Sequence, residues 1–428
     1  MNLKKIIKSN YTILENMASL SLLQMANYLI PIIVLPFIVR DLGVEMIGKI
    51  SYAQNIIQYF TIFITYGFEY SATREIAIHK NNHEKTKQIF WSVIVTKILL
   101  LTISFLSLLV LSACWGRVQE DIPLYLCLFA VNIGFTFFPT WFFQGIEKMK
   151  SMAIVNFLIK SIGTGMSVFF IHAPEDYLVF AYMPSSAHAI LGFAAFIYVI
   201  RKYKLSSVSF VREEFFTQNK KAFPIFLNTL FTTLYTIANT TILGLFVNDY
   251  DLGIYSGAHK IIMCILMVTS MPINLSIFPS IGKKMEESKK EGLKLFKKMG
   301  IYVVLISILF SGLTWIFAPI LVKILLGAEF FPCIPILKVF SCLPFLVITA
   351  SLCTVQGLYG LGFQKYAPIM GLIVGSVCIF MNFQFIPLWG MYGAAISWII
   401  SQFLEILISG GIVLFMSKKI MKSEESQQ

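Results

Sequence analysis

The chain has 428 residues, of which 57% are hydrophobic, 15% aromatic and only 13% charged, and its formal net charge is +12. Soluble proteins carry about a quarter of charged residues, so this composition excludes an ordinary soluble domain. The seven cysteines lack the paired or metal-type spacing of a disulfide framework or a zinc site. The composition instead predicts an all-α polytopic membrane protein.

Twelve apolar segments follow one another along the chain, each of about the 20 residues that a helical crossing needs. The expected spans are 13–38, 49–70, 88–112, 123–143, 152–172, 178–200, 222–246, 253–279, 300–325, 334–358, 369–387 and 392–415. The first continues past the length of a signal peptide without a small-residue cleavage site, so it is expected to be a span. The longest loops are expected at 71–87, 201–221 and 280–299, and 282–298 is a candidate interfacial amphipathic helix.

Basic residues fall in alternate loops. If the amino terminus is cytoplasmic, the cytoplasmic segments hold 26 of the 34 Lys and Arg. The opposite loops contain Arg40 and Arg117 and are otherwise acidic. This asymmetry predicts that both termini are cytoplasmic. The net positive charge is then a feature of topology and contact with anionic membrane lipids, and no nucleic-acid partner is expected.

Two halves of the chain resemble each other. Gly48, Ser51, Ala53, Ile56 and Ile57 match Gly253, Ser256, Ala258, Ile261 and Ile262 at a constant offset of 205, and Gln144-Gly145-Ile146 matches Gln356-Gly357-Leu358 at 212. Six spans per copy give both copies the same orientation, related by a pseudo-two-fold axis along the membrane normal. The predicted domains are an amino-terminal six-helix lobe (1–200), a cytoplasmic linker (201–221) and a carboxy-terminal six-helix lobe with its tail (222–428).

Few charged side chains lie within the spans, where each costs several kcal/mol unless it faces protein or water. Lys97, Lys160 and Lys260 are the basic ones, and Lys260 takes the repeat position of Asn55. Each lysine either snorkels to the interface or lines a cavity that attracts an anion. Glu405, near the middle of the last span, is either a structural hydrogen-bond partner or a site for H⁺ or Na⁺. Glu69 and Arg74 flank the inner end of the second span.

Uncharged polar residues also gather in particular spans. The first two spans contain Asn27 and Asn55, and the seventh contains Asn228, Thr232, Tyr235 and Asn239 at helical spacing, so these four share one face. Such a stripe suits a hydroxyl-rich ligand such as a sugar, or else hydrogen bonds between helices. There is no Walker loop, GxSxG motif or histidine-rich metal spacing, so the sequence predicts neither an enzyme nor a metal site.

Two stretches resemble a known family. The segment LPFIVRDLGVEMIGKISYAQNIIQYFTIFITYGFEYSATREIA (35–77) and the segment PTWFFQGIEKMK (139–150) are similar to signatures of Wzx-type polysaccharide flippases. The resemblance implies the multidrug/oligosaccharidyl-lipid/polysaccharide exporter superfamily and its bilobed, V-shaped fold. Arg74 is the one candidate that lies inside a matched stretch.

The resemblance further implies flipping of undecaprenyl-pyrophosphate-linked oligosaccharide, such as O-antigen for lipopolysaccharide, from the cytoplasmic to the periplasmic face of the bacterial inner membrane. An O-antigen polymerase and a chain-length regulator are the partners that it suggests. The residues then predict a cationic vestibule in which Arg74, Lys97, Lys160 and Lys260 attract the pyrophosphate. Asn27, Asn55, Asn228, Tyr235 and Asn239 offer hydrogen bonds, and Glu405 or Glu69 is the candidate for ion coupling. No other cofactor is expected.

Three alternatives remain open from the sequence. A cation-coupled multidrug exporter of the same superfamily would favour acidic cavity residues, whereas three of the four deepest charges here are lysines. A lipid II flippase usually has fourteen spans, and twelve are expected here. A non-transporting scaffold of a glycan assembly complex would require neither buried lysines nor a polar seventh span.

Overall fold

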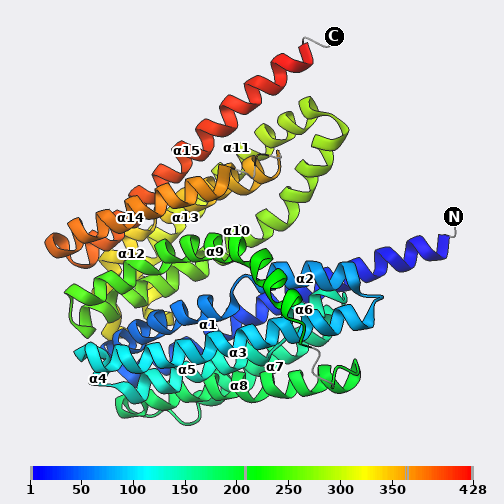
Figure 1. The fold of residues 1–428 in the computed structure, drawn as a ribbon. Coiled ribbons are helices and arrows are strands. Elements are labelled where there is room, and N and C mark those ends of the chain that lie inside the picture. The colour runs from blue at the N-terminus through cyan, green and yellow to red at the C-terminus, as the bar shows by residue number, and fades with distance from the viewer. Residues whose placement is uncertain (1–2, 207–209, 362, 364–365, 426–428) are drawn as a thin grey trace. The chain divides into compact units, whose positions relative to one another are not determined.

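The computed structural model describes residues 3–206, 210–361, 363 and 366–425, and within this part of the chain the regular structure is helical (Figure 1). The polypeptide divides into two compact units. The first contains residues 1–43 and 50–230, and the second contains 44–49 and 231–428. The predicted all-α polytopic class is confirmed.

The first unit is a bundle whose elements alternate long helices with short, broken ones. It contains α1 (Leu3–Thr65) except for residues 44–49, α2 (Phe68–His79), α3 (His83–Cys114), α4 (Gly116–Gln119), α5 (Ile122–Phe137), α6 (Thr140–Gly145), α7 (Met149–Ser167), a 3₁₀ turn (Pro174–Asp176), α8 (Tyr177–Lys202) and the start of α9 (Arg212–Phe246).

The second unit contains the rest of α9 and the elements that follow. These are α10 (Asp249–Glu287), α11 (Lys289–Leu325), a 3₁₀ turn (Ala328–Cys333), α12 (Ile334–Phe340), α13 (Leu343–Ser351), a π-helical segment (Leu352–Tyr359), α14 (Ala367–Trp389) and α15 (Met391–Glu425). A π-helical segment of eight residues is unusual, because π-helices mostly occur as single-turn bulges at functional sites.

Seven helices in the described part of the chain are long and apolar enough to cross a membrane. An eighth is obtained if the pair Ala328–Phe340 and Leu343–Tyr359, bent by 45°, is one broken span. The apolar helices Met152–Ser167 and Ile237–Phe246 are shorter than this criterion. A multi-pass membrane protein is therefore established, and the count of twelve stays a prediction.

The three longest segments expected as loops are largely helical. Residues 71–79 continue α2, residues 212–221 form the first turns of α9, and α10 and α11 continue through 280–299 with a break only at Ser288. The candidate helix 282–298 is therefore helical in two pieces, and its place at a membrane interface stays a prediction. The hydropathy pattern marks polar residues as outside the membrane, but a polar stretch does not by itself stop a helix. Ser288 does end one, because its side chain caps α11 by accepting from the Glu291 N–H.

Two of the expected spans are interrupted by identifiable residues. The helix α1 is kinked at Gly43, whose φ of 74° lies in the left-handed region that glycine adopts readily. It ends at Thr65, where Tyr66 and Gly67 both have positive φ, so the expected span 49–70 is split from α2. The expected span 123–143 is split between α5 and α6 at Phe138 and Pro139.

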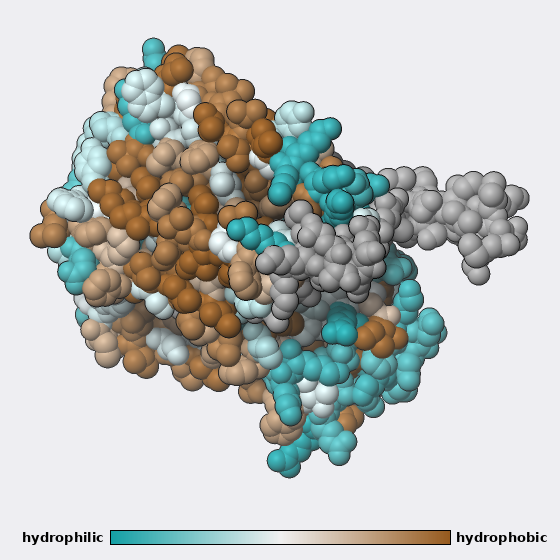
Figure 2. Space-filling view, turned by 90° about the horizontal axis from the view of Figure 1, so that it is seen from above, coloured by the Kyte–Doolittle hydropathy of each residue, from teal (hydrophilic) through white to brown (hydrophobic). Residues whose placement is uncertain are grey.

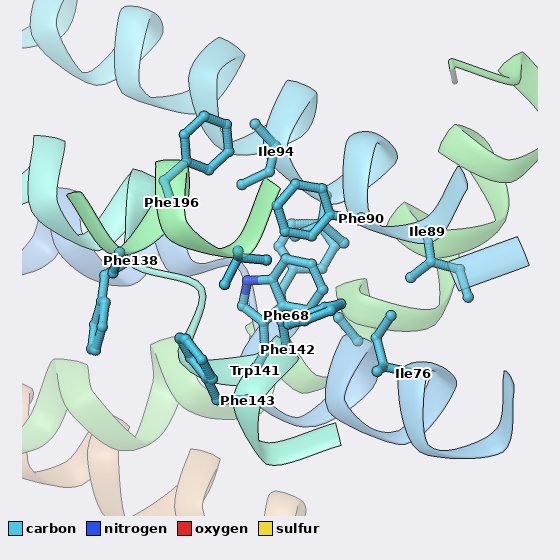
Figure 3. Packing of buried hydrophobic residues seen from close by; sticks show 14 of the residues in the cluster. Phe68, Ile76, Ile89, Phe90, Ile94, Phe138, Trp141, Phe142, Phe143 and Phe196 are labelled. Carbon is cyan, nitrogen blue, oxygen red and sulfur yellow. The ribbon is translucent and has the colours of Figure 1, made fainter. Parts of the chain in front are cut away.

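An aromatic core holds the first unit together (Figure 3). Phe90 lies 5.5 Å between ring centroids from both Trp141 and Phe142, and 6.0 Å from Phe196. These rings come from α3, α6 and α8, and Phe68 adds a fourth element, α2. Such packing contributes about 3–5 kcal/mol per large aromatic side chain and fixes the short helices α2 and α6 against the long ones.

Much of the molecular surface is apolar. Figure 2 shows brown, apolar residues covering a broad area of one face and teal, hydrophilic residues gathered to one side of it. In α11 alone, the exposed large apolar residues are Ile301, Tyr302, Leu305, Ile306, Ile308, Leu309, Leu313, Trp315, Ile316, Phe317, Ile320 and Ile324. A helix with this exposed set is suited to contact lipid.

The basic connections of the first unit meet at one end. His83 Nε2 lies 2.9 Å from the Tyr203 carbonyl oxygen, and Lys80 lies 3.6 Å from Glu147. The α2–α3, α6–α7 and post-α8 connections are thereby brought together. The acidic connections contact one another elsewhere, where the Tyr177 hydroxyl donates to Asp121 at 3.0 Å. This separation is the one that the charge asymmetry predicts; which end is cytoplasmic stays a prediction.

Candidate functional site

Lys97, in α3, is completely enclosed in the first unit. Its ammonium group donates to the Phe135 carbonyl oxygen at 3.0 Å and lies 3.9 Å from a Glu69 carboxylate oxygen. The Phe135 carbonyl would accept from the residue four positions later in a continuous helix, but that residue is Pro139, which has no N–H. Lys97 therefore satisfies a carbonyl group that the break between α5 and α6 leaves open.

Glu69 completes this arrangement. Its side chain is 33% exposed, whereas that of Lys97 is 0% exposed. The Thr140 hydroxyl also donates to the Glu69 carboxylate. Lys97 thus has an acidic partner and no surface available to a ligand, and the geometry assigns it a role in joining α2, α3 and α5. Glu69 is the only one of the two charged groups that a solute could reach.

Arg74, next along α2, is exposed, and no ion pair to it is found among the described residues. Its neighbour Glu75 is buried and pairs with Lys221 of α9 at 2.8 Å. Lys85 of α3 pairs with the buried Glu214, also of α9. Two residues of the expected linker 201–221 therefore form ion pairs with α2 and α3 of the first unit, and Arg74 is left facing outward.

Lys260 lies in α10 of the second unit, within the apolar stretch Asp249–Ser270. It is half-buried, and in the described part of the chain no carboxylate forms an ion pair with it. The preceding residue, His259, is enclosed by aromatic rings, with Tyr255 stacked at 6.1 Å and Trp398 at 5.3 Å between centroids. His259 is therefore a packing residue, whereas Lys260 is a cation in an apolar stretch with no carboxylate partner among the described residues.

Glu405 lies in α15 beside the π-helical segment. Its carboxylate accepts from the Thr354 hydroxyl at 3.1 Å and from the Gln402 amide at 3.5 Å. Both partners are uncharged. The same π-helical segment contributes Gln356, which donates to Asn274 of α10 at 2.9 Å. Glu405 is thus a half-buried carboxylate whose side-chain donors among the described residues are both neutral, beside a non-standard backbone segment.

The polar stripe predicted in α9 is only partly described, because the side chains of Thr232 and Tyr235 lie outside the described residues. Asn239 is 2% exposed and accepts from the Asn382 amide at 2.6 Å, so its oxygen joins two helices of the second unit. Asn228 is exposed and Asn55 is half-buried. The side chains of Asn27, Lys160 and Tyr235 lie outside the described residues. The structure thus pairs Lys97 with Glu69 and leaves Lys260 and Glu405 as separate uncompensated charges.

Several polar partners were not found from the sequence. Thr354 and Gln402 are ordinary hydroxyl and amide residues outside the two signature segments, and Thr140 lies in the signature 139–150 but was not singled out there. The repeat, however, carries a usable signal, because the offset of 205 that relates Gly48 to Gly253 also relates Glu69 to Asn274. Both of these contact the broken helix of their own unit, through Thr140 and Gln356 respectively. In the described residues no group of three or more His, Cys, Asp or Glu could hold a metal ion.

The architecture defines the class of the protein. Over 95% of this chain and 99% of the other, it is similar to the inward-facing conformation of a multidrug resistance MATE family transporter of the MOP superfamily, with a TM-score of 0.74 and 14% identity. The outward-facing conformation of such a transporter matches with a TM-score of 0.60 and 12% identity, over 96% of each chain. The fold is therefore that of these multi-pass membrane transporters.

The family follows from the sequence match. Residues 13–285 match the family described as polysaccharide biosynthesis protein, and the chain belongs to this family. A putative O-antigen transporter of Escherichia coli K12 is 26% identical over 94% of this chain and 96% of its own. One of Shigella dysenteriae is 28% identical over 95% and 99%. The resemblance drawn from 35–77 and 139–150 is confirmed, and the relatives are named as transporters, not enzymes.

Proposed function

We propose that the protein is a flippase for an undecaprenyl-pyrophosphate-linked oligosaccharide, an O-antigen unit or a similar one, carried from the cytoplasmic to the periplasmic face of the inner membrane. The family, the relatives named as putative O-antigen transporters and the transporter fold support this proposal. In it, both termini are cytoplasmic. The polymerase and chain-length regulator of polysaccharide assembly remain its expected partners.

The observation that carries the proposal is the uncompensated ammonium group of Lys260. A charge in an apolar span costs about 2.5 kcal/mol or more, so it is seldom retained without a partner or a task. Lys97 has its partner in Glu69, whereas Lys260 has none among the described residues. A pyrophosphate carries two or more negative charges and would supply the missing counter-charge during passage.

The remaining candidate residues contribute contacts to the substrate in this mechanism. The exposed Arg74 attracts the pyrophosphate at the surface of α2, while Asn55 and Asn228 offer hydrogen bonds to sugar hydroxyls. Lys160, Asn27 and Tyr235 stay as predicted contacts, whereas Asn239 is buried and its oxygen is already bonded to Asn382. The polyprenyl tail remains in lipid, and alternating access exposes the head group to each side in turn. No bond is made or broken.

Ion coupling is assigned to Glu405, with Glu69 as the second candidate. Protonation of Glu405, or binding of Na⁺, removes the cost of a carboxylate that only Thr354 and Gln402 contact. The hydrogen bond from Thr354 links this event to the π-helical segment, which is a backbone element suited to rearrangement. Glu405→Gln, which mimics the protonated side chain, is expected to abolish the dependence of transport on the ion gradient.

One observation favours a second function, the export of cationic drugs. Glu405 has no basic partner among the described residues, and two of the similar solved structures are those of a multidrug resistance transporter. A drug cation would need this carboxylate, whereas a pyrophosphate would need Lys260. The two functions therefore make opposite demands on two residues of the same unit.

The deciding experiment uses cells that lack the gene and accumulate lipid-linked oligosaccharide on the inner leaflet. Four proteins are expressed at matched abundance in these cells. They are the unsubstituted chain, Lys260→Ala, Lys260→Arg and the exposed control Lys323→Ala. We expect the chain, Lys260→Arg and Lys323→Ala to restore surface polysaccharide, and Lys260→Ala to fail. Full restoration by Lys260→Ala, together with drug resistance that depends on Glu405, would replace the flippase by the exporter.

A further inference from the structure

A pocket of about 320 Å³ lies at the basic end of the first unit. It is formed where the α2–α3, α6–α7 and post-α8 connections meet, and it is separate from the residues proposed for transport. Its floor is buried and consists of Thr86, Phe142 and Leu205. Lys80, Asn81 and Lys148 line its rim and are exposed.

The rim is held in place by the backbone. Glu147 and Lys204 have φ values of 60° and 52°, a left-handed conformation that non-glycine residues adopt at a cost. Each ends a helix in the same way, since the Lys148 N–H donates to the Phe143 carbonyl and the Leu205 N–H to the Ile200 carbonyl, both at 2.9 Å. A third contact, between His83 Nε2 and the Tyr203 carbonyl oxygen, also fixes the rim. The shape of the pocket is therefore set by backbone contacts.

The electrostatics of the pocket are positive. Lys148 lies over the Tyr203 ring, 5.2 Å from its centroid, and Lys80 has one exposed acidic neighbour, Glu147, at 3.6 Å. Glu84 is the other nearby acid and lies 4.0 Å from His83 and from Lys87, outside the lining. Lys148 also begins α7, so the positive end of that helix dipole adds to the potential of the two lysines.

We propose that this pocket binds a phosphate group at the basic end of the first unit. The two ammonium groups of Lys80 and Lys148 act as point charges, and lysine is a common phosphate-binding residue of this kind. The volume is at the lower limit of about 300 Å³ for ligand pockets, so it holds a head group and not an oligosaccharide. The phosphate belongs either to a bilayer phospholipid or to a small soluble molecule.

The test uses the full-length chain in nanodiscs of phosphatidylcholine. Two probes are compared, namely inorganic phosphate in solution and phosphatidylglycerol added to the bilayer, with bound lipid counted by native mass spectrometry. The combined variant Lys80→Gln and Lys148→Gln is expected to lower binding of the effective probe about tenfold or more, as expected for the loss of charge-assisted hydrogen bonds. Glu147→Gln is expected to raise it, since it frees Lys80.

The control is Lys150→Gln, an exposed lysine two residues from Lys148 that does not line the pocket. It should bind as the unchanged chain does. Binding of phosphatidylglycerol alone identifies a lipid head group, and binding of inorganic phosphate alone identifies a soluble ligand. The proposal is overturned if neither probe binds, or if Lys150→Gln loses as much binding as the pocket variant while Glu147→Gln gains none.

Discussion

In the first unit the enclosed ammonium of Lys97 has both a carbonyl group and the Glu69 carboxylate beside it. In the second unit, no carboxylate pairs with Lys260 among the described residues, and Glu405 accepts from the uncharged Thr354 and Gln402. The charges of Lys97 and Glu69 therefore compensate each other and stabilise a broken helix. Lys260 and Glu405 have no such partner in the described part of the chain, and a charge that is not compensated within the fold is the better candidate for binding a ligand or an ion.

The largest effect is expected from the Lys97 pair. Lys97→Met leaves the Phe135 carbonyl without its side-chain donor and the Glu69 carboxylate with Thr140 as its remaining partner among the described residues. This costs about 3 kcal/mol, at the lower end for a broken pair because Glu69 is partly exposed, so less folded protein should reach the membrane. Adding Glu69→Gln to Lys97→Met should recover part of the abundance, because both charges are then gone. Membrane abundance and thermal unfolding in detergent measure this. Normal abundance of Lys97→Met with lost transport would show instead that Lys97 serves the substrate.

The close approach of α5 and α8 gives the next largest effect. A Cβ at Gly134 would lie 2.0 Å from His188 Nδ1 and 2.5 Å from its backbone oxygen. Gly134→Ala should therefore destabilise the first unit by about 1–3 kcal/mol. Gly165→Ala in α7 is the matched control, since a Cβ there meets open space. Equal melting temperatures for the two variants would refute the packing of these helices.

A smaller effect is expected where α9 is fixed to the first unit. Burial raises the pKa of the Glu214 carboxyl, but the hydrogen bonds from Lys85 and Gln218 and the charges of Lys85 and Lys221 leave that pKa below its usual value. Glu214 therefore stabilises the fold above the unfolded pKa of about 4.3, and this stability is lost as pH falls through the folded pKa.

Glu214→Gln should accordingly cost about 1 kcal/mol at neutral pH, because Lys85 is partly exposed and solvent screens the pair. The difference in melting temperature between the chain and this variant should shrink as the pH is lowered from 7 to 3. Glu213→Gln, at an exposed neighbouring position, provides the control. If the difference in melting temperature instead grew as the pH was lowered, the Lys85–Glu214 ion pair would not be stabilising the fold.

The sequence predicted the helical class, the family and the carboxyl ends of two spans, at Phe246 and Leu325, because hydropathy and the flanking residues determine these directly. It did not predict the pairing of Lys97 with Glu69. That pair depends on the break at Pro139 and on the fold that brings α2 to α3, neither of which a hydropathy pattern contains. Depth in a span identifies a costly charge, but only tertiary structure shows whether the charge is compensated.

The sequence did not predict that α9 begins within the charged segment 212–221, for a related reason. Residues 212–221 were read as a loop because they are charged, yet Glu214 and Gln218 are one turn apart and face the first unit together, with Gln218 donating to Glu214 at 2.7 Å. The polar stripe of the same helix stays a prediction, because the side chains of Thr232 and Tyr235 lie outside the described residues. Asn228 and Asn239 share a helical face by spacing, but the two ends of α9 belong to different units and meet different surroundings.

The most direct measurement compares surface polysaccharide at equal protein abundance for Lys260→Ala in the second unit with Lys97→Met combined with Glu69→Gln in the first. The account predicts that Lys260→Ala accumulates normally and exports no polysaccharide, while the protein of the double variant that reaches the membrane still exports it. Normal export by Lys260→Ala, with loss of export per folded molecule in the double variant, would contradict it.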